Sequence, residues 1–414
     1  MFFLSIFLTF LSTSYLAHGG LHDFRVRGLE DPASVALSKN EKIVEAWITQ
    51  PLDHFNHRDN RTWSMRYLEN SGHFVKNAPI FIIIGGEWAI SPPYLEGGLM
   101  YEIATNHSGM MYYTEHRYYG KSKPTEDTSP ENLQYLNVDQ ALADLAYFIE
   151  AKKKDERMKD SPVVIFGGSY AGNMAAWFKL KYPHLVLGAL ASSAPVFAKA
   201  DFYGNLCEVP DRKSPNDIAL FTNTLAEVKL CENIIYKIRI TLCTWQIFAE
   251  HIIRLYTLTL PLKVHLLTQF ARPVRQWYHQ TCTEYGYYQT TSSKNSIFGT
   301  LFPLDYFVTK GRRLIFFKIF FSYDGKFLDS RVQRTNLMYG GSHPALSNVI
   351  FSNGDLDPWH SLSILKDLNK SCPSIFIEDS SHCRDLHADA ATDPKGLIKA
   401  RAQIRSIISQ WLID

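Results

Sequence analysis

The chain has 414 residues, of which 46% are hydrophobic and 14% aromatic, so it can form one large domain with an insertion or two or three average domains. Its 43 basic and 41 acidic side chains leave a formal net charge of +2. This balance offers no chain-wide positive field, so we expect no nucleic-acid partner and look for function in local groups of residues.

The first 19 residues are predicted to be a secretory signal peptide. Residues 1–11 are apolar and uncharged, and residues 17–19 are Ala-His-Gly, which gives a signal peptidase small residues beside its cleavage site. A buried N-terminal strand is the alternative interpretation. The apolar stretch is too short for a stable membrane span, so we expect a secreted or lysosomal protein.

The cysteines and the glycosylation sequons agree with this route. The six cysteines are an even number, typical of an oxidising compartment in which disulfide bonds form: Cys207, Cys231, Cys243, Cys282, Cys372 and Cys383. None belongs to a CxxC pair, so we expect no metal site. No cofactor is expected either. Three sequons predict glycosylation at Asn60, Asn106 and Asn369.

The next residues in the chain predict alternating strands and helices. Residues 63–68 and 79–84 are strand-like, and the second run is continuously apolar, as in a strand buried on both faces of a parallel sheet. A further strand is predicted at 110–114. Asn137 and Gln140 have the spacing of a capping box that opens an amphipathic helix over 141–153.

Residues 163–172 predict a strand, a sharp turn and a helix around Ser169. Small residues flank this serine, and a nucleophile elbow needs them because it holds its serine in a strained backbone region. The helix that follows points its amino end at the same place, so the Tyr170 N–H can stabilise a developing oxyanion. An ordinary turn is the alternative interpretation.

The remaining pattern predicts an α/β fold with a doubly wound, mostly parallel sheet and an inserted, mainly helical cap. Further strands are predicted at 186–191, 348–351 and 374–377, and a final helix at 395–412. Basic and aromatic residues alternate in 312–321, which we interpret as a buried cap segment and not as a membrane-surface segment. The predicted division is 1–19 signal peptide, 20–200 first part of the main domain, 201–330 cap and 331–414 second part of the main domain.

Two later loops offer partners for the serine. In α/β-hydrolases the acid and the base follow the nucleophile in the order Ser, Asp, His. Asp357 follows one late strand and His382 follows the next. We expect His382 to accept the serine proton and Asp357 to hold the imidazole tautomer. Asp355 is the rival for Asp357, with an Asx turn as its structural alternative. His116 precedes the serine, where this topology does not place the base.

Many segments resemble the serine peptidase family that includes lysosomal prolyl carboxypeptidase, dipeptidyl peptidase II and thymus-specific serine protease. The chain looks nearest to the thymus-specific branch and its invertebrate relatives. The resembling stretches are residues 50–56, 84–87, 115–122, 140–145, 167–170, 175–177, 181–184, 281–286, 334–336, 353–359 and 381–383. The resemblance implies an α/β-hydrolase fold with a helical cap. It carries over Ser169, Asp357 and His382 as the catalytic triad, and its Asp-Pro-Trp context selects Asp357 above Asp355.

Two further expectations concern the surroundings of the triad. By the general pattern of the fold, the turn at Gly86 and Glu87 supplies the second oxyanion donor. The resemblance covers about 45–200 and 275–414, whereas residues 204–272 contain little of the family's cap sequence. Because the cap normally closes the substrate site, we expect any unusual specificity to arise there.

The expected function is that of a serine peptidase that hydrolyses peptides through an acyl-enzyme. The family's better-known members cleave peptides next to proline, starting from one end or the other of the substrate, so the resemblance implies an exopeptidase. A homodimer is also possible from the family. The alternatives are a serine carboxypeptidase of the other α/β-hydrolase family, an esterase, and a hydrolase-fold protein that binds without catalysing.

Overall fold

The computed structural model describes residues 29–32, 43–203, 275–294, 303–315 and 324–413. The predicted signal peptide and most of the predicted cap lie outside these residues, as do Cys207, Cys231 and Cys243.

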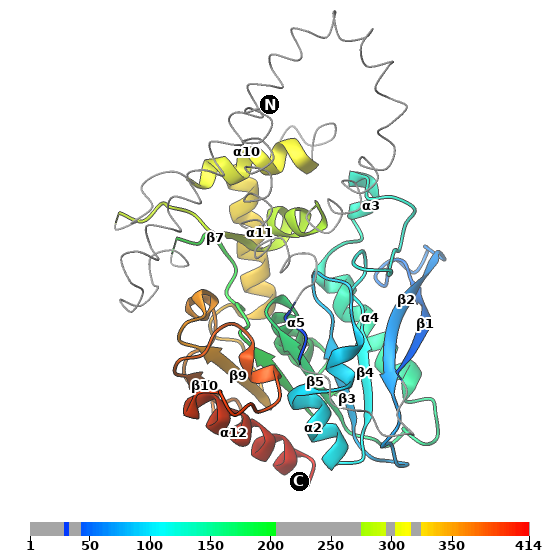
Figure 1. Cartoon of the computed structure of the whole chain (residues 1–414). Coiled ribbons are helices and arrows are strands. Elements are labelled where there is room, and N and C mark those ends of the chain that lie inside the picture. The colour runs from blue at the N-terminus through cyan, green and yellow to red at the C-terminus, as the bar shows by residue number, and fades with distance from the viewer. Residues whose placement is uncertain (1–28, 33–42, 204–274, 295–302, 316–323, 414) are drawn as a thin grey trace, which may run out of the picture.

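The core of the described part is an eight-stranded, mostly parallel sheet (Figure 1). The strands lie in the order β1, β2, β4, β3, β5, β6, β9, β10, and the pairings of β1 with β2 and of β2 with β4 are antiparallel. Their bounds are β1 Val44–Pro51, β2 Thr62–Asn70, β3 Ile80–Ile84, β4 Met110–Thr114, β5 Val163–Gly168, β6 Gly188–Ser192, β9 Val349–Gly354 and β10 Ser374–Ile377. This topology confirms the predicted α/β-hydrolase fold.

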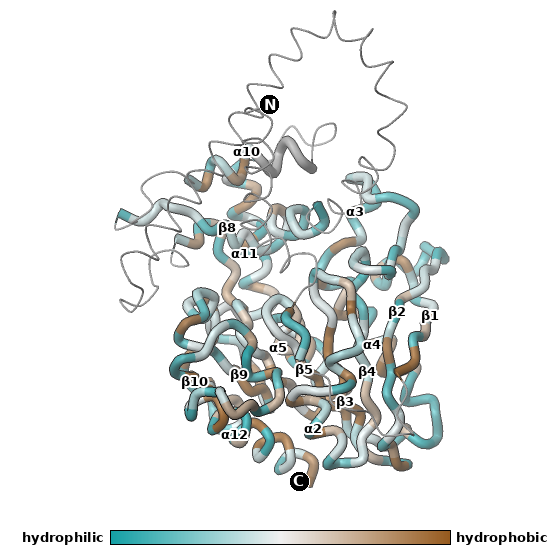
Figure 2. The backbone as a smooth tube through the Cα atoms, in the orientation of Figure 1, coloured by the Kyte–Doolittle hydropathy of each residue, from teal (hydrophilic) through white to brown (hydrophobic). Residues whose placement is uncertain are grey.

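The central strands form because their residues are apolar in continuous runs. All five residues of β3, Ile-Phe-Ile-Ile-Ile, are buried, and so are all six residues of β5. Such runs suit strands that are covered by helices on both faces. Figure 2 shows hydrophobic segments in these central strands and hydrophilic segments in the surface loops. The hydrophobic core is therefore centred on the middle strands of the sheet. One of them, β5, leads directly to the candidate nucleophile.

Helices cover both faces of the sheet (Figure 1). On one face α2 and α12 lie side by side, joined by an ion pair between Arg405 and Glu102. On the other face α4 and α5 pack together. The bounds are α2 Gly98–Asn106, α4 Val138–Lys152, α5 Tyr170–Lys181 and α12 Lys395–Trp411. The Asn137 side chain accepts a hydrogen bond from the Gln140 N–H and caps α4 as predicted.

The described segments in and around the predicted cap, 201–330, are anchored on α5 through α11, which extends nine residues beyond the predicted boundary. These segments are β7 Lys199–Asp201, η2 Thr281–Tyr285, β8 Gly286–Tyr288, α10 Leu304–Ile315 and α11 Gly325–Tyr339. Tyr339 of α11 stacks on Trp177 of α5 with 4.5 Å between the ring centres. The Asn336 side chain donates to the Ala198 carbonyl and accepts from its N–H. Position 331, the predicted start of the second main-domain part, lies inside α11.

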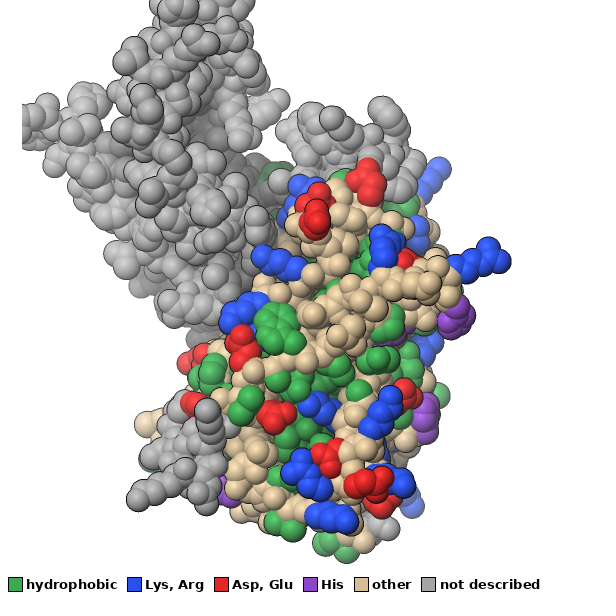
Figure 3. Space-filling view, turned by 90° about the vertical axis from the view of Figure 1, so that its right-hand side faces the viewer, with side chains coloured by type: hydrophobic (Ala, Val, Ile, Leu, Met, Phe, Trp, Pro, Cys, Tyr) green, Lys and Arg blue, Asp and Glu red, His purple; other side chains and the backbone are tan. Residues whose placement is uncertain are grey.

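Two core elements were not expected from the sequence. Strand β1 is an edge strand whose side chains are mostly exposed or half-buried, so it lacks the apolar run of a central strand. Helix α2 has nine residues and no acidic first turn, so its ends carry weak signals. Figure 3 shows acidic and basic side chains interspersed on the surface near the β1 edge of the sheet, in agreement with the balanced charge.

Candidate active site

Ser169 occupies the sharp turn between β5 and α5. Its backbone has φ 58° and ψ −129°, a left-handed region that a non-glycine residue rarely adopts. The Ser169 N–H donates to the Ser192 carbonyl at 2.9 Å, and the Ser169 carbonyl accepts the Asn173 N–H in the first turn of α5. These bonds hold the residue in its strained conformation at the carboxyl end of β5, with 8% of its surface exposed.

Glycine at position 167 allows this turn to close. A Cβ on Gly167 would lie 2.0 Å from the Ala171 carbonyl oxygen, which no side chain can do without moving the backbone. Ala171 itself is fully buried, so a methyl group is accommodated at the last position of the motif. The departure from the Gly-x-Ser-x-Gly pattern is therefore compatible with the elbow.

His382 lies beside Asp357. The His382 Nδ1 and the Asp357 Oδ2 are 2.8 Å apart, and Asp357 is completely buried. The other oxygen of Asp357 accepts the Trp359 N–H at 3.0 Å. Burial alone would raise the pKa of Asp357, but the neighbouring imidazole and these hydrogen bonds hold it below its usual value. The acid is thus arranged to stay ionised and to orient the imidazole.

Asp355 has a different role in the structure. Its Oδ1 accepts the Ser380 N–H at 3.2 Å and so links the loop after β9 to the loop after β10, whereas His382 is paired with Asp357. This contact joins two loops 25 positions apart, so it differs from the local Asx turn that the sequence offered as the alternative for Asp355.

The loop with His382 packs against the elbow. A Cβ on Gly168, the residue before the candidate nucleophile, would lie 3.0 Å from the Sγ of Cys383, the residue after His382. The Cys383 N–H donates to the Ser193 Oγ at 2.9 Å, just beyond the end of β6. The fold therefore brings the predicted nucleophile and base into the same small region.

The candidate oxyanion donors come from two adjacent strands. Tyr170 is the first residue of α5, where a backbone N–H has no partner within the helix. Gly86 and Glu87 follow β3, which pairs in parallel with β5. The three predicted residues therefore lie at the carboxyl ends of neighbouring strands, where parallel α/β sheets place their sites.

Asp385 is a structural group that the sequence did not reveal. It is buried, and its two oxygens accept the Ser192 Oγ at 2.5 Å and the Ser352 Oγ at 2.6 Å. It thereby ties the loop with His382 to the ends of β6 and β9. Burial raises the pKa of Asp385 although both serines oppose this. No local pattern marks such a residue, because its partners are 193 and 33 positions away.

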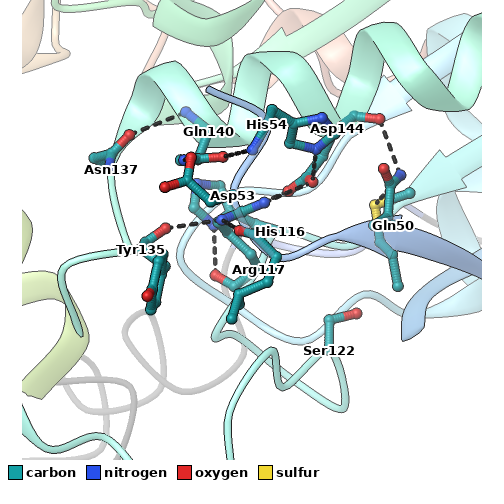
Figure 4. A network of polar contacts seen from close by, with 12 residues as sticks. Gln50, Asp53, His54, His116, Arg117, Ser122, Tyr135, Asn137, Gln140 and Asp144 are labelled. Carbon is teal, nitrogen blue, oxygen red and sulfur yellow. Dashed lines mark hydrogen bonds and ion pairs between the residues drawn. The ribbon is translucent and has the colours of Figure 1, made fainter. Parts of the chain in front are cut away.

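A second unexpected feature is a buried charge network formed by three of the family-like stretches (Figure 4). Arg117 is fully buried and makes a two-pronged ion pair with Asp144 of α4, at 2.6 and 2.7 Å. His54, just after β1, contacts the same carboxylate at 2.8 Å. The network connects, through His116, to the hydroxyl of Tyr170, 3.1 Å from the His116 Nε2.

The remaining predicted sites are placed as follows. Asn60, Asn106 and Asn369 are all exposed, as glycan acceptors must be. Cys282, Cys372 and Cys383 are buried and do not form disulfides with one another. In the described ranges, no cluster of three or more His, Cys, Asp or Glu side chains could hold a metal ion. No helix of the part of the chain that the structure describes is long and apolar enough to cross a membrane.

Sheet topology, elbow backbone and the paired histidine and aspartate define an α/β-hydrolase of the serine-nucleophile class. Residues 50–220 and 254–404 match the family model of serine carboxypeptidase S28. The chain belongs to this family and is a serine-type peptidase. This confirms the family expected from the sequence and replaces the other serine carboxypeptidase family and the esterase as interpretations.

Curated relatives match almost the whole chain. The mouse thymus-specific serine protease is 29% identical over 89% of this chain and 88% of its own length. The mouse lysosomal Pro-X carboxypeptidase is 30% identical over 90% of each chain. Among solved structures, an arylesterase is 10% identical with a TM-score of 0.42 and covers 98% of this chain and 97% of its own.

Proposed function

We propose that the protein is a secreted or lysosomal exopeptidase that cleaves peptide bonds following proline, with Ser169, His382 and Asp357 as its catalytic triad. The observation that carries the triad is the hydrogen bond from His382 to the buried Asp357, with His382 on a loop that packs against the residue before Ser169. The proline preference is supported by the relatives described as Pro-X carboxypeptidases. The destination is supported by the same relatives and by the predicted signal peptide.

The reaction follows from the roles of these groups. His382 removes the proton of the Ser169 hydroxyl as the Ser169 Oγ attacks the substrate carbonyl carbon. The π electrons of that carbonyl move onto the carbonyl oxygen. The N–H of Tyr170 and an N–H of Gly86 or Glu87 stabilise that oxyanion. Its collapse breaks the C–N bond, and His382 gives the proton to the leaving amine. Water then hydrolyses the acyl-enzyme by the same steps.

The triad is tested by Ser169→Ala. This variant should stay folded and lose measurable turnover, because the residual rate of triad variants lies several orders of magnitude below the wild type. The matched control is Ser330→Ala, which changes an exposed serine on α11 and should keep full activity. Undiminished turnover by Ser169→Ala would contradict the proposed nucleophile.

Labelling with a fluorophosphonate separates catalysis from mere binding. The folded wild type should label at Ser169 and the Ser169→Ala variant should not. A folded wild type that remains unlabelled would favour a hydrolase-fold protein that binds peptides without cleaving them.

Substrate class is tested with a mixed peptide library at acid and neutral pH. Blocking the amino or the carboxyl terminus of the best substrate then shows which end the enzyme needs. Equal cleavage of both blocked forms would contradict exopeptidase action, and cleavage without regard to proline would contradict the preference.

A further inference from the structure

The hydroxyl of Tyr170 is fixed on its core side by a chain of buried contacts that runs through His116 and Arg117. Figure 4 shows these two residues in the buried network. Arg117 is immobilised by Asp144 and by the carbonyls of Leu52 and Tyr135, at 3.1 and 2.9 Å. Its own carbonyl lies 2.7 Å from the Nδ1 of His116. Because a carbonyl oxygen only accepts, the Nδ1 carries the proton and the Nε2 is left as an acceptor.

His116 stays neutral in this environment. Burial lowers its pKa to about 4, although the hydrogen bond to the Arg117 carbonyl opposes this. The lone pair of its Nε2 faces the Tyr170 hydroxyl at 3.1 Å. Tyr170 therefore donates its hydroxyl proton to a base whose tautomer and orientation are set by the Arg117 network.

The cap holds the same hydroxyl from the opposite direction. The Gln280 Nε2 donates to the Tyr170 hydroxyl at 2.9 Å, and the Tyr285 hydroxyl donates to it at 3.1 Å. Gln280 is oriented in turn, because its Oε1 accepts the hydroxyl of Tyr119 at 2.7 Å. The Tyr170 hydroxyl thus donates once and accepts twice, which uses its full hydrogen-bonding capacity.

The position of Tyr170 gives these contacts a consequence for catalysis. It follows the candidate nucleophile directly, and its backbone N–H is the proposed first oxyanion donor. The peptide unit between Ser169 and Tyr170 belongs to a strained turn, with φ 58° at Ser169. Strained backbone persists only where surrounding contacts hold it. Tyr170 is the residue on the helix side of this peptide unit, so fixing its side chain restrains the unit in addition to the backbone bonds of Ser169.

We propose that the Tyr170 hydroxyl, held between His116 of the core and Gln280 of the cap, is a positioning group that aims the oxyanion-hole N–H. This inference rests on the proposed function and makes correct seating of the cap a condition for a working oxyanion hole. Tyr170 acts here through its own backbone, and His116 and Gln280 act through Tyr170.

The first test is Tyr170→Phe, which removes the hydroxyl and keeps the ring against Trp277 and Tyr285. We expect kcat on a peptide substrate to fall about 10- to 100-fold and KM to stay within twofold. A misplaced donor weakens stabilisation of the transition state, whereas binding of the substrate in its ground state does not depend on it. The rate of fluorophosphonate labelling of Ser169 should fall in parallel. The control is Tyr112→Phe, which removes another buried hydroxyl, beside Met158, and should leave kcat unchanged.

A second variant changes the cap-side partner of the Tyr170 hydroxyl, so the proposal can still be tested if Tyr170→Phe unfolds. Gln280→Met should lower kcat in the same way by a smaller factor, and the double variant should lose no more than Tyr170→Phe alone, since both changes act on one hydroxyl. Full kcat in folded Tyr170→Phe, or in folded Gln280→Met, would overturn the positioning role. An unlabelled wild type would instead overturn the proposed function, so the two failures are distinguishable.

Discussion

Two buried polar clusters flank Ser169, and they are assembled in different ways. The histidine-loop cluster consists of Asp357, His382 and Asp385 with the serines at the ends of β6 and β9. The Tyr170 cluster consists of Tyr170, His116, Tyr119, Gln280, Glu284 and Tyr285. The first is built on the carboxyl ends of the sheet strands, whereas the second joins the core to the cap. Rearrangement of the cap should therefore affect the second far more than the first.

The two clusters also differ in how they treat a buried carboxyl group. In the histidine-loop cluster, the imidazole and a backbone N–H keep the pKa of Asp357 low. In the Tyr170 cluster, burial raises the pKa of Glu284 to about 7, although the Val138 N–H and Gln280 lower it in part. No cation contacts Glu284 among the described residues. Asp357 is thus arranged to hold a charge and Glu284 to exist without one at acid pH, whereas burial raises the pKa of Asp385 within the first cluster as well.

The largest effect should come from the histidine-loop cluster. Asp357→Asn is expected to lower kcat about 10⁴-fold, because the imidazole loses the acceptor that fixes its tautomer. Steady-state kinetics on a peptide substrate measure this. The matched control is Asp355→Asn, which weakens one contact between the loops after β9 and β10 and should lose less than tenfold. Equal losses in the two variants would contradict the assignment of the acid.

The next largest effect should be a loss of unfolding free energy when the buried Arg117–Asp144 ion pair, which supports the Tyr170 cluster, is broken. Asp144→Asn leaves the guanidinium of Arg117 buried without its counter-charge, and this should cost about 3–5 kcal/mol of unfolding free energy. Urea unfolding measures the loss. The control, Asp59→Asn, breaks the exposed ion pair with Arg61 and should leave the unfolding midpoint almost unchanged. Similar midpoints for both variants would show that the buried network does not hold the cluster.

The smallest effect concerns the pH dependence of stability. Glu284 has a folded pKa of about 7 against 4.5 ordinarily, so the folded protein binds more protons than the unfolded chain between these values. Its contribution to stability is complete below about pH 4.5 and is lost as the pH rises to 7, by about 3 kcal/mol. Glu284→Gln should remove this slope. Urea unfolding at pH 4.5, 5.5, 6.5 and 7.5 tests it, and parallel curves for both proteins would refute it.

The same contrast explains what the sequence could predict. The strands with continuous apolar runs, such as β3 and β5, were predicted because burial on both faces leaves that local record. The triad candidates followed from chain order, since this topology places acid and base after the last strands. Edge strand β1 was not predicted, because its side chains are mostly exposed or half-buried.

Long-range polar contacts left no such record. Gln140 was predicted to complete a capping box with Asn137, yet its side chain binds the backbone N–H of His54 and the carboxylate of Asp53, 86 and 87 positions away. Asp385 and the Tyr170 cluster likewise depend on which segments meet in space. A sequence pattern identifies the residues of such a network, but only the fold shows which of them touch.

The backbone conformation of Ser169 also has a cost in the stability of the fold. A non-glycine residue held at φ 58° costs on the order of 1–3 kcal/mol, and glycine at the same position would avoid most of that cost. Serine at this turn therefore costs stability that glycine would not, as expected of a residue present for its hydroxyl and not for the stability of the fold.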